Sequence, residues 1–477
     1  MTAVPRLVLS APSSGQGTNA LAIGLLAALA ERGLEVAGFK IGPDRADAAY
    51  LGLAAGRPGR NLDPRLVGPQ RLGPLFRHGA DGAGLAVVQG TMGLYDSVGG
   101  RPEAESTAAV ATALRSPVVL VVDVAAMGQS VAALVHGFRS YDEQLWLGGV
   151  ILTQVASQRH EETLREALDD IAVPVYGALR RHELPAVLPA RRHGAVPALH
   201  GDPEAIRAVR RLGEAVAGTV DVDRLLGLAR SAPELTVEPW SPSAGLEPAA
   251  GEALPAGGGA PGGGAPGGPA PLVAVAGGPG GGYGYPETAE LLRAAGAELV
   301  TVDPLRDEAL PAGTRALVVG AGLTESYARE LSANRRLCIA VAELARTGRP
   351  VVAEGTGLLW LARELDGLPM CGVLDVIGAS RDGVVVGYRE ATALSDSVVA
   401  TTGEVAVGYK QHGAVLTPRA GQRAAWSWDG GLPEGFVWRG VHASQLGLHW
   451  AGHPRLAPRL VAAAAATVGA EGVSTLA

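Results

Sequence analysis

A glycine-rich segment near the start of the chain has residue types and spacing suited to binding phosphate. Residues 12–20 read PSSGQGTNA and lie between the apolar run RLVLSA at 6–11 and an apolar helical segment at 20–33. A strand, a glycine-rich turn and a helix in this order present backbone N–H groups and a helix N-terminus to an anion. Gly15 and Gly17 permit close backbone approach. The pattern predicts an anion-binding loop, and a turn that binds nothing is the alternative.

Two side chains that phosphoryl transfer needs are absent from this loop. Phosphate-binding loops carry a lysine for the outer phosphates, followed by a serine or threonine for magnesium. Thr18 and Asn19 occupy these two positions. Thr18 is neutral and too short to replace the lysine, and Asn19 suits only a magnesium-bound water. Because phosphoryl transfer depends on positioned charge, we expect the loop to have lost much of its catalytic power.

The elements that must position this loop are short, unbroken apolar runs separated by helical patterns. Such runs occur at 36–41, 85–88, 118–122 and 147–155. Apolar runs without alternation are typical of parallel strands that are buried on both faces. Strands that alternate with helices form βαβ units with right-handed crossovers. The first part of the chain is therefore predicted to be an α/β domain around a parallel sheet.

A stretch rich in Gly, Pro and Ala separates this domain from a second one. It extends from about 240 to 271 and cannot build a core, because ordering its backbone would cost more than burial returns. Strand and helix patterns resume after it, with strands at 272–276, 299–302, 316–319 and 351–354 and helices at 286–296 and 332–347. Residues 383–450 show hairpin-like alternation. We predict domains at 1–238 and 272–477, joined by a flexible linker at 239–271.

Composition excludes some classes of partner and location. The formal net charge is −7, which disfavours a nucleic acid as partner. No apolar stretch is long enough to span a bilayer, and the N-terminus does not resemble a signal peptide. Cys338 and Cys371 have neither metal-site nor disulfide spacing and are expected to be small packing residues. These features favour a cytoplasmic protein without a membrane or nucleic-acid partner.

Several motifs resemble those of cobyrinate (hydrogenobyrinate) a,c-diamide synthases. FKIGPDRAD at 39–47 is similar to the family's FKVGPDYID, RNLDP at 60–64 to its RNLD segment, and VQGTMGLYD at 88–96 to its VEGVMGLFDG. Further matches follow in the same order at 123–138, 149–152, 157–160, 304–308, 331–334 and 371–374. Because these segments extend over nearly the whole chain, the resemblance covers both predicted domains.

The resemblance implies a fold and a reaction. The first domain is expected to be a P-loop synthetase domain like that of dethiobiotin synthetase, built on a parallel sheet. The second is expected to be an α/β domain like a class I glutamine amidotransferase. The family uses ATP and magnesium to activate two corrin side-chain carboxylates, which are then aminated with ammonia from glutamine.

In the first domain the resemblance marks several polar positions. Lys40, Asp44 and Asp47 match polar family residues, and the two carboxylates suit magnesium coordination. An aspartate after a strand can instead cap a helix or form a turn. Gln89 replaces a family glutamate and removes an anionic ligand, and Thr153 replaces an asparagine at a position that resembles an adenine-reading site. The vestigial nucleotide site is thus predicted to comprise Gly15, Gly17, Thr18, Asn19, Lys40, Asp44, Asp47 and Gln89.

In the second domain the family's nucleophile is missing. The family pattern AECGGL reads AEGTGL at 353–358, so Gly355 takes the place of the cysteine. Glycine has no side chain to attack a carboxamide, and it relieves the backbone strain that such a turn stores. Thr356 follows the turn, so we expect its hydroxyl to point elsewhere. Exchange of Gly355 and Gly447 for the family residues is expected to leave a folded protein.

The family's base is missing as well. Its motif ASYLHLHW reads ASQLGLHW at 443–450, which places Gly447 at the first histidine, taken to be the base. The upstream motif GHEFH is reduced to GYKQH at 408–412. His412 and His449 remain, either close enough to touch or as packing or surface histidines.

Two functions from different classes account for these losses. The first is a pseudoenzyme of cobalamin biosynthesis that keeps a binding or partner role, with a corrinoid precursor or another small-molecule carboxylate as ligand. It would act as a homodimer or in a complex with an intact synthase. The alternative is an active ATP-dependent amide ligase that uses free ammonia, with Lys40 approaching the phosphates in place of the loop lysine. Binding of ATP with magnesium distinguishes the two.

Overall fold

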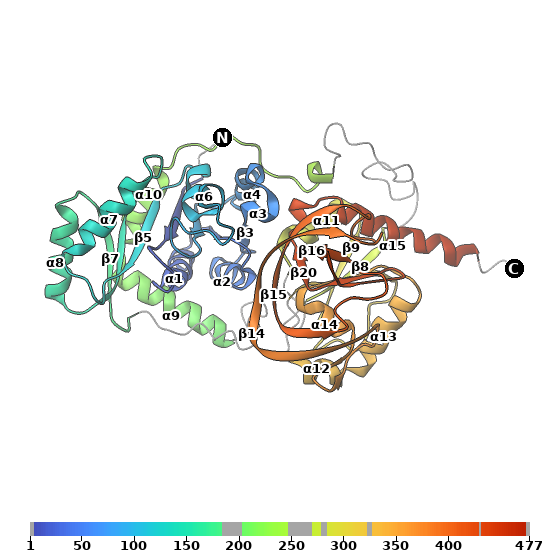
Figure 1. Ribbon diagram of the computed structural model, residues 1–477. Helices are drawn as coiled ribbons and strands as arrows, with labels where there is room; N and C mark the ends of the chain where they lie inside the picture. The colour runs from blue at the N-terminus through green and yellow to red at the C-terminus, as the bar shows by residue number, and fades with distance from the viewer. Residues whose placement is uncertain are drawn as a thin grey trace. The chain divides into compact units, whose positions relative to one another are not determined.

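The chain folds into two compact units that meet in the sequence between Trp240 and Ser241. The computed structural model describes residues 4–183, 203–246, 270–277, 284–321, 327–428 and 431–473 (Figure 1). Most of the predicted linker, residues 247–269, lies outside the described residues. Trp240, at the start of that linker, packs on the first unit. Its backbone N–H donates to Pro74 O at 2.9 Å, and its ring contacts His78 edge-on.

The first unit is built on a seven-stranded parallel sheet with strand order β3-β2-β4-β1-β5-β6-β7. The predicted parallel sheet is confirmed, because the unbroken apolar runs form strands buried on both faces. The strands are β1 (Arg6–Ser10), β2 (Val36–Ile41), β3 (Arg60–Leu62), β4 (Leu85–Gln89), β5 (Val118–Asp123), β6 (Leu147–Val155) and β7 (Val175–Arg180). The carboxyl ends of β1, β2 and β4 therefore meet at one edge of the sheet.

Helices connect these strands and cover the sheet (Figure 1). The glycine and alanine content of the first helix allows another helix to approach closely. A Cβ added at Gly24 of α1 would lie 2.5 Å from Val216 of α9. The helices of this unit are α1 (Thr18–Glu31), α2 (Arg45–Ala55), α3 (Pro64–Val67), α4 (Leu72–Gly79), α5 (Pro102–Glu105), α6 (Thr107–Ala113), α7 (Ser130–Tyr141), α8 (Gln158–Asp169), α9 (Pro203–Thr219) and α10 (Val222–Arg230).

The second unit contains two sheets. The first has the order β18-β19-β11-β10-β8-β9 and is parallel except at β18. The second is formed around a long antiparallel hairpin of β14 and β15. The strands are β8 (Leu272–Ala276), β9 (Glu298–Val302), β10 (Thr314–Val319), β11 (Val351–Glu354), β12 (Ala362–Leu365), β13 (Leu368–Pro369), β14 (Leu374–Ala393), β15 (Val405–Thr417), β16 (Trp426–Trp428), β17 (Leu432–Glu434), β18 (Phe436–Trp438), β19 (Val441–Ser444) and β20 (Leu446–Leu448).

The helices of the second unit pack against an apolar core that contains both cysteines. Cys338 and Cys371 are buried, as expected of packing residues. They are close in space although distant in sequence: a hydrogen bond with Cys371 is the main cause that lowers the pKa of Cys338 to about 7. The helices are α11 (Pro286–Ala294), α12 (Ala328–Ala333), α13 (Arg335–Arg346), α14 (Leu358–Leu361) and α15 (Leu456–Val473).

One prediction of secondary structure is corrected in this unit, and a second is extended. The single helix expected at 332–347 is interrupted at Asn334, whose side chain accepts from Leu337 N and caps α13. Its amide also donates to the carbonyls of Pro304 and Asp307. The antiparallel pairing expected over 383–450 holds for β14 with β15 and for β18 with β19, but β19 also pairs in parallel with β11, which lies outside that range.

No helix among the described residues is long and apolar enough to cross a membrane.

Candidate functional site

The glycine-rich loop connects β1 to α1 and leaves the start of the helix uncapped. Gly15 and Gly17 have φ angles of +87° and +91°, in the left-handed region that glycine adopts without strain. No side chain caps α1, and its first turn carries no acidic residue. The first N–H groups of a helix lack intrahelical partners and carry a partial positive charge. The loop therefore keeps the backbone features of an anion-binding site.

Two contacts attach the loop to the neighbouring strands. Gln16 Oε1 accepts a hydrogen bond from Asp123 N at 2.6 Å, and Thr153 Oγ1 donates to Gln16 O at 3.2 Å. Thr153 is buried and donates to Val122 O as well. The Thr153 hydroxyl thus binds the loop backbone of the protein itself, rather than the adenine base of a nucleotide.

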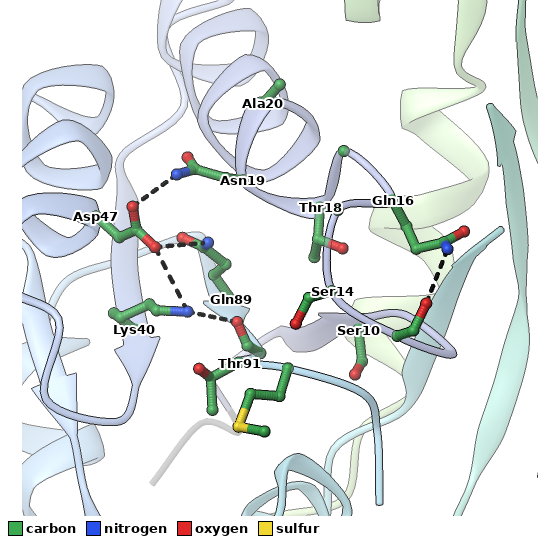
Figure 2. A pocket seen from close by; sticks show the side chains of 15 residues that line it. Ser10, Ser14, Gln16, Thr18, Asn19, Ala20, Lys40, Asp47, Gln89 and Thr91 are labelled. Atoms are coloured by element: carbon green, nitrogen blue, oxygen red, sulfur yellow. Dashed lines mark hydrogen bonds and ion pairs between the residues drawn. The ribbon is translucent and has the colours of Figure 1, made fainter. Parts of the chain in front are cut away.

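A cavity of about 480 Å³ lies beside the loop. Side chains from β1, α1, β2, α2 and the end of β4 converge on it (Figure 2). The sequence did not single out Ser10 or Thr91, and the one available signal was a polar Ser10 ending an otherwise apolar strand. The lining residues are Ser10, Ser13, Ser14, Gly15, Gln16, Gly17, Thr18, Asn19, Ala20, Lys40, Asp47, Gln89, Gly90, Thr91 and Met92.

Asp47 is the centre of a closed polar cluster in this cavity. Figure 2 shows Asn19, Gln89 and Lys40 pointing toward its carboxylate. Asn19 Nδ2 donates to Oδ1 at 2.6 Å, Gln89 Nε2 donates to Oδ2 at 3.2 Å, and Lys40 Nζ lies 3.6 Å from Oδ2. Lys40 Nζ also donates to Gly90 O at 2.5 Å. The carboxylate is thus neutralised by a lysine and enclosed by two amide donors.

Of the predicted nucleotide-site residues, Asp44 has a different task from the rest. Its Oδ1 accepts from the N–H groups of Ala46 and Asp47 and caps α2. Lys40 and Asp47 line the cavity. In the described ranges no group of three or more His, Cys, Asp or Glu side chains is arranged to hold a metal ion. Two amide donors and the Lys40 ammonium already surround the Asp47 carboxylate, so magnesium would compete with them for its oxygens.

The turn after β11 in the second unit, here named the elbow, has a left-handed backbone at its first residue. β11 ends at Glu354 and a short 3-10 turn begins at Gly355, which is buried with φ +57°. This left-handed backbone is costly for a residue with a side chain and is tolerated by glycine. The Thr356 hydroxyl donates to Ala321 O at 2.9 Å and is buried. Thr356 therefore serves the packing of the turn.

The space above Gly355 is filled. A Cβ built on Gly355 would lie 2.4 Å from Cβ of Ala321, closer than real Cβ atoms approach. A larger residue at position 355 would require Ala321 to move or change with it, and the expectation that the exchanged protein still folds stays a prediction.

The Glu354 side chain links the chain segments that carry Gly355 and Gly447. Its carboxylate accepts from Leu448 N at 3.2 Å and from Trp450 Nε1 at 2.9 Å, and all three residues are buried. Gly355 directly follows Glu354, and Gly447 directly precedes Leu448. The fold thus places side by side the two positions where the sequence predicted a nucleophile and a base, and neither carries a side chain.

Comparison with known proteins gives one family over nearly the whole chain. A hydrogenobyrinate a,c-diamide synthase of Streptomyces coelicolor is 51% identical, covering 96% of this chain and 97% of that protein. One of Thermobifida fusca is 45% identical, covering 96% and 97%. A cobyrinate a,c-diamide synthase of Dehalococcoides mccartyi is 33% identical, again covering 96% and 97%. The chain belongs to the cobyrinate and hydrogenobyrinate a,c-diamide synthase family.

The first unit of this family member also matches a broader nucleotide-binding family. Residues 7–194 match the family described as CobQ/CobB/MinD/ParA nucleotide binding domain. The family patterns place a lysine at Thr18 and a glutamate at Gln89. The two replacements together remove one positive and one negative charge, so the summed charge of the cavity is unchanged.

The two histidines left from the family's motifs do not form a pair. Lys410 pairs with Leu446 and Gly408 with Leu448, so His412 and His449 lie about five residue positions apart along the ladder, roughly 16 Å. The expectation that they could touch is therefore wrong.

Each of these histidines packs within the core of the second unit. His412 Nδ1 lies 2.9 Å from Ala414 O, and burial, reinforced by the charge of Lys410, lowers the pKa of His412 to about 4. The ring of His449 stacks on Tyr285 at 4.0 Å, and its Nε2 lies 3.8 Å from the Glu287 carboxylate.

Proposed function

We propose that this chain is a member of the a,c-diamide synthase family that keeps the binding framework but no longer makes amides from ATP and glutamine. Its second unit would be a class I glutamine amidotransferase-like domain without glutaminase activity. The observation that carries the proposal is Gly355, which stands at the elbow where the family places its cysteine. With no thiol or hydroxyl at that position, no acyl-enzyme intermediate can form with glutamine.

The neighbourhood of Gly355 supports the same conclusion. The Ala321 methyl group lies too close to the position that a Cβ at residue 355 would take, and Thr356 uses its hydroxyl to bond Ala321 O. Gly447 supplies no base beside the elbow. A nucleophile, the space for it and a base are thus missing together, so no single substitution regenerates the dyad.

The loop site supports loss of the ATP-dependent step. Thr18 supplies no charge to the outer phosphates, and Asp47 is enclosed by Lys40, Asn19 and Gln89. Magnesium would have to displace these donors to reach the carboxylate. Without the loop lysine and the metal, two sources of transition-state charge are lost. A retained role in binding a corrinoid precursor or another small-molecule carboxylate, as a homodimer or beside an intact synthase, is consistent with these losses.

One observation favours the alternative of an ammonia-dependent ligase. Lys40 reaches the cavity from β2, so a cation is present beside the loop although Thr18 is neutral. Its ammonium is already engaged by Gly90 O and Asp47. Transfer to a phosphate would leave Asp47 without its counter-charge, which ranks this function second.

An assay of the purified full chain tests the proposal. Glutamate release from glutamine and ADP formation are measured with magnesium, ATP and hydrogenobyrinate, beside a relative that carries the loop lysine and the elbow cysteine. Both products are expected at the level of a protein-free blank. Glutamate release above the blank would refute the role assigned to Gly355. Amide formation from ammonium salts alone would establish the ligase function instead.

A further inference from the structure

Three buried oxygen atoms in the loop cavity have no hydrogen-bond partner within the described part of the chain: Ser10 Oγ, Asn19 Oδ1 and Gln89 Oε1. Ser10 is 1% exposed and Gln89 is 3% exposed. Buried polar atoms are nearly always paired in folded proteins, and each orphan costs free energy comparable to a lost hydrogen bond. Their grouping around one cavity therefore points to a ligand that supplies the missing partners.

The orientation of the two amides is fixed by Asp47. A carboxylate only accepts hydrogen bonds, so Asn19 and Gln89 must direct their NH₂ groups at it. Their carbonyl oxygens then face away from Asp47 and have no protein donor. These oxygens accept hydrogen bonds, so the ligand group beside them must carry an N–H or O–H.

The opposite side of the cavity favours a hydrogen-bond acceptor instead of a donor. The N-terminus of α1 and the loop at Gly15 and Gly17 present N–H groups with no side-chain cap. They favour an anionic oxygen. A single ligand group that satisfies both sides needs anionic oxygens on one side and a hydrogen-bond donor on the other. A monoprotonated phosphate has both.

Magnesium is not required for this arrangement and is not favoured by it. Amide oxygens can coordinate a divalent cation, but Mg²⁺ is normally held by carboxylates together with phosphate oxygens. The carboxylate in the cavity is already paired with Lys40 at 3.6 Å. The replacement of glutamate by Gln89 also removed a further anion that the family pattern offers.

We propose that the loop cavity binds a phosphate group without a divalent cation, with the phosphate O–H donating to the amide oxygen of Gln89. The inference rests on the proposed function, in which the loop no longer transfers phosphoryl groups, and it names the ligand class of that same site. The phosphate is either inorganic or the terminal group of a phosphate ester.

Isothermal titration of the full chain tests the proposal with inorganic phosphate and with ADP, each in EDTA and in magnesium. Binding in EDTA is expected for at least one probe, with an affinity that magnesium changes by less than about twofold. ADP bound more tightly than phosphate would identify an ester as the ligand, and equal affinity would identify the free anion. No heat with either probe in EDTA, or binding that requires magnesium, would overturn the proposal.

Gln89→Glu is the decisive variant, because it restores a carboxylate with almost the same shape. It should weaken phosphate binding in EDTA by about tenfold or more through charge repulsion, and magnesium should recover part of the loss. Gln144→Glu adds the same charge at an exposed position of this unit and should change nothing. An unaltered affinity of Gln89→Glu in EDTA would contradict the proposal.

Ser10→Ala provides a second test that adds no charge, should Gln89→Glu fail to fold. Loss of its hydroxyl is expected to weaken phosphate binding about fivefold both in EDTA and in magnesium. A Ser10→Ala protein that binds as well as the parent would count against the site. If phosphate does not bind and ATP is not turned over, only this inference is refuted. If ATP is turned over with magnesium, the proposed function is refuted.

Discussion

The loop cavity of the first unit and the elbow of the second depart from the family patterns in different ways. At the loop, charged residues of the family are replaced by neutral polar ones, and the cavity stays open and polar. At the elbow, the reacting side chains are removed altogether, and Ala321 fills the space above Gly355. A cavity therefore remains beside the loop, whereas Ala321 occupies the space above Gly355.

The physical constraints on the two sites explain this difference. In the cavity, the replacements at Thr18 and Gln89 remove one charge of each sign, which leaves the summed charge unchanged. At the elbow, the left-handed backbone penalises any residue except glycine, so removal of the nucleophile relieves strain. In a site held together by charge, replacements come in pairs of opposite sign, whereas a single replacement by glycine can relieve the strain of a turn.

The largest expected effect concerns the charge cluster of the first unit. Asp47→Asn should lower the free energy of unfolding by about 3–5 kcal/mol, because Lys40 stays buried without a counter-charge. Urea denaturation measures the loss. Adding Lys40→Met to Asp47→Asn should recover part of it in a double-mutant cycle. A loss of less than about 1 kcal/mol, typical of an exposed ion pair, would show that the cluster is not closed.

The second largest expected effect is a loss of stability in acid that arises in the second unit. Burial lowers the pKa of His412 to about 4 and that of His442 to about 3, and both lie in the second unit. The unfolded chain binds protons at these histidines near pH 6.5, whereas the folded chain does not. Stability is therefore full above pH 6.5 and falls as the pH drops toward 4, by about 3 kcal/mol at His412.

His412→Gln isolates this contribution in urea titrations between pH 7 and pH 4. The variant should lose less stability over this interval than the parent protein, whatever its stability at neutral pH. His136→Gln, at an exposed position of the first unit, serves as the control and should follow the parent. Identical slopes for His412→Gln and the parent would mean that His412 is protonated in the folded state.

The smallest effect tests whether packing closes the elbow. Gly355→Cys should cost about 1–3 kcal/mol, because its Cβ meets Cβ of Ala321 at 2.4 Å. Ala321→Gly in the same chain should recover most of the steric part, leaving the smaller cost of the left-handed backbone. Urea denaturation of the single and double variants measures both. A Gly355→Cys protein as stable as the parent would remove the distinction between a closed elbow and an open cavity.

Much of the fold could be predicted from local patterns. The parallel sheet of the first unit follows from unbroken apolar runs, because strands buried on both faces have no need of alternation. The interruption at Asn334 was missed, since an asparagine that caps a helix and holds a distant loop has the same identity as one inside a helix. The parallel pairing of β19 with β11 was missed because pairing depends on residues nearly a hundred positions apart.

The sequence by itself determined which reacting groups are absent. Thr18, Gln89, Gly355 and Gly447 are a matter of residue identity, and no fold can supply a missing ammonium, carboxylate, thiol or imidazole. The tertiary structure alone decided how the remaining groups are used. That Lys40, Asn19 and Gln89 enclose Asp47, that Asp44 caps α2, and that Ala321 fills the elbow all depend on distances between separate elements. Such distances are set by packing of the whole chain, which local sequence does not encode.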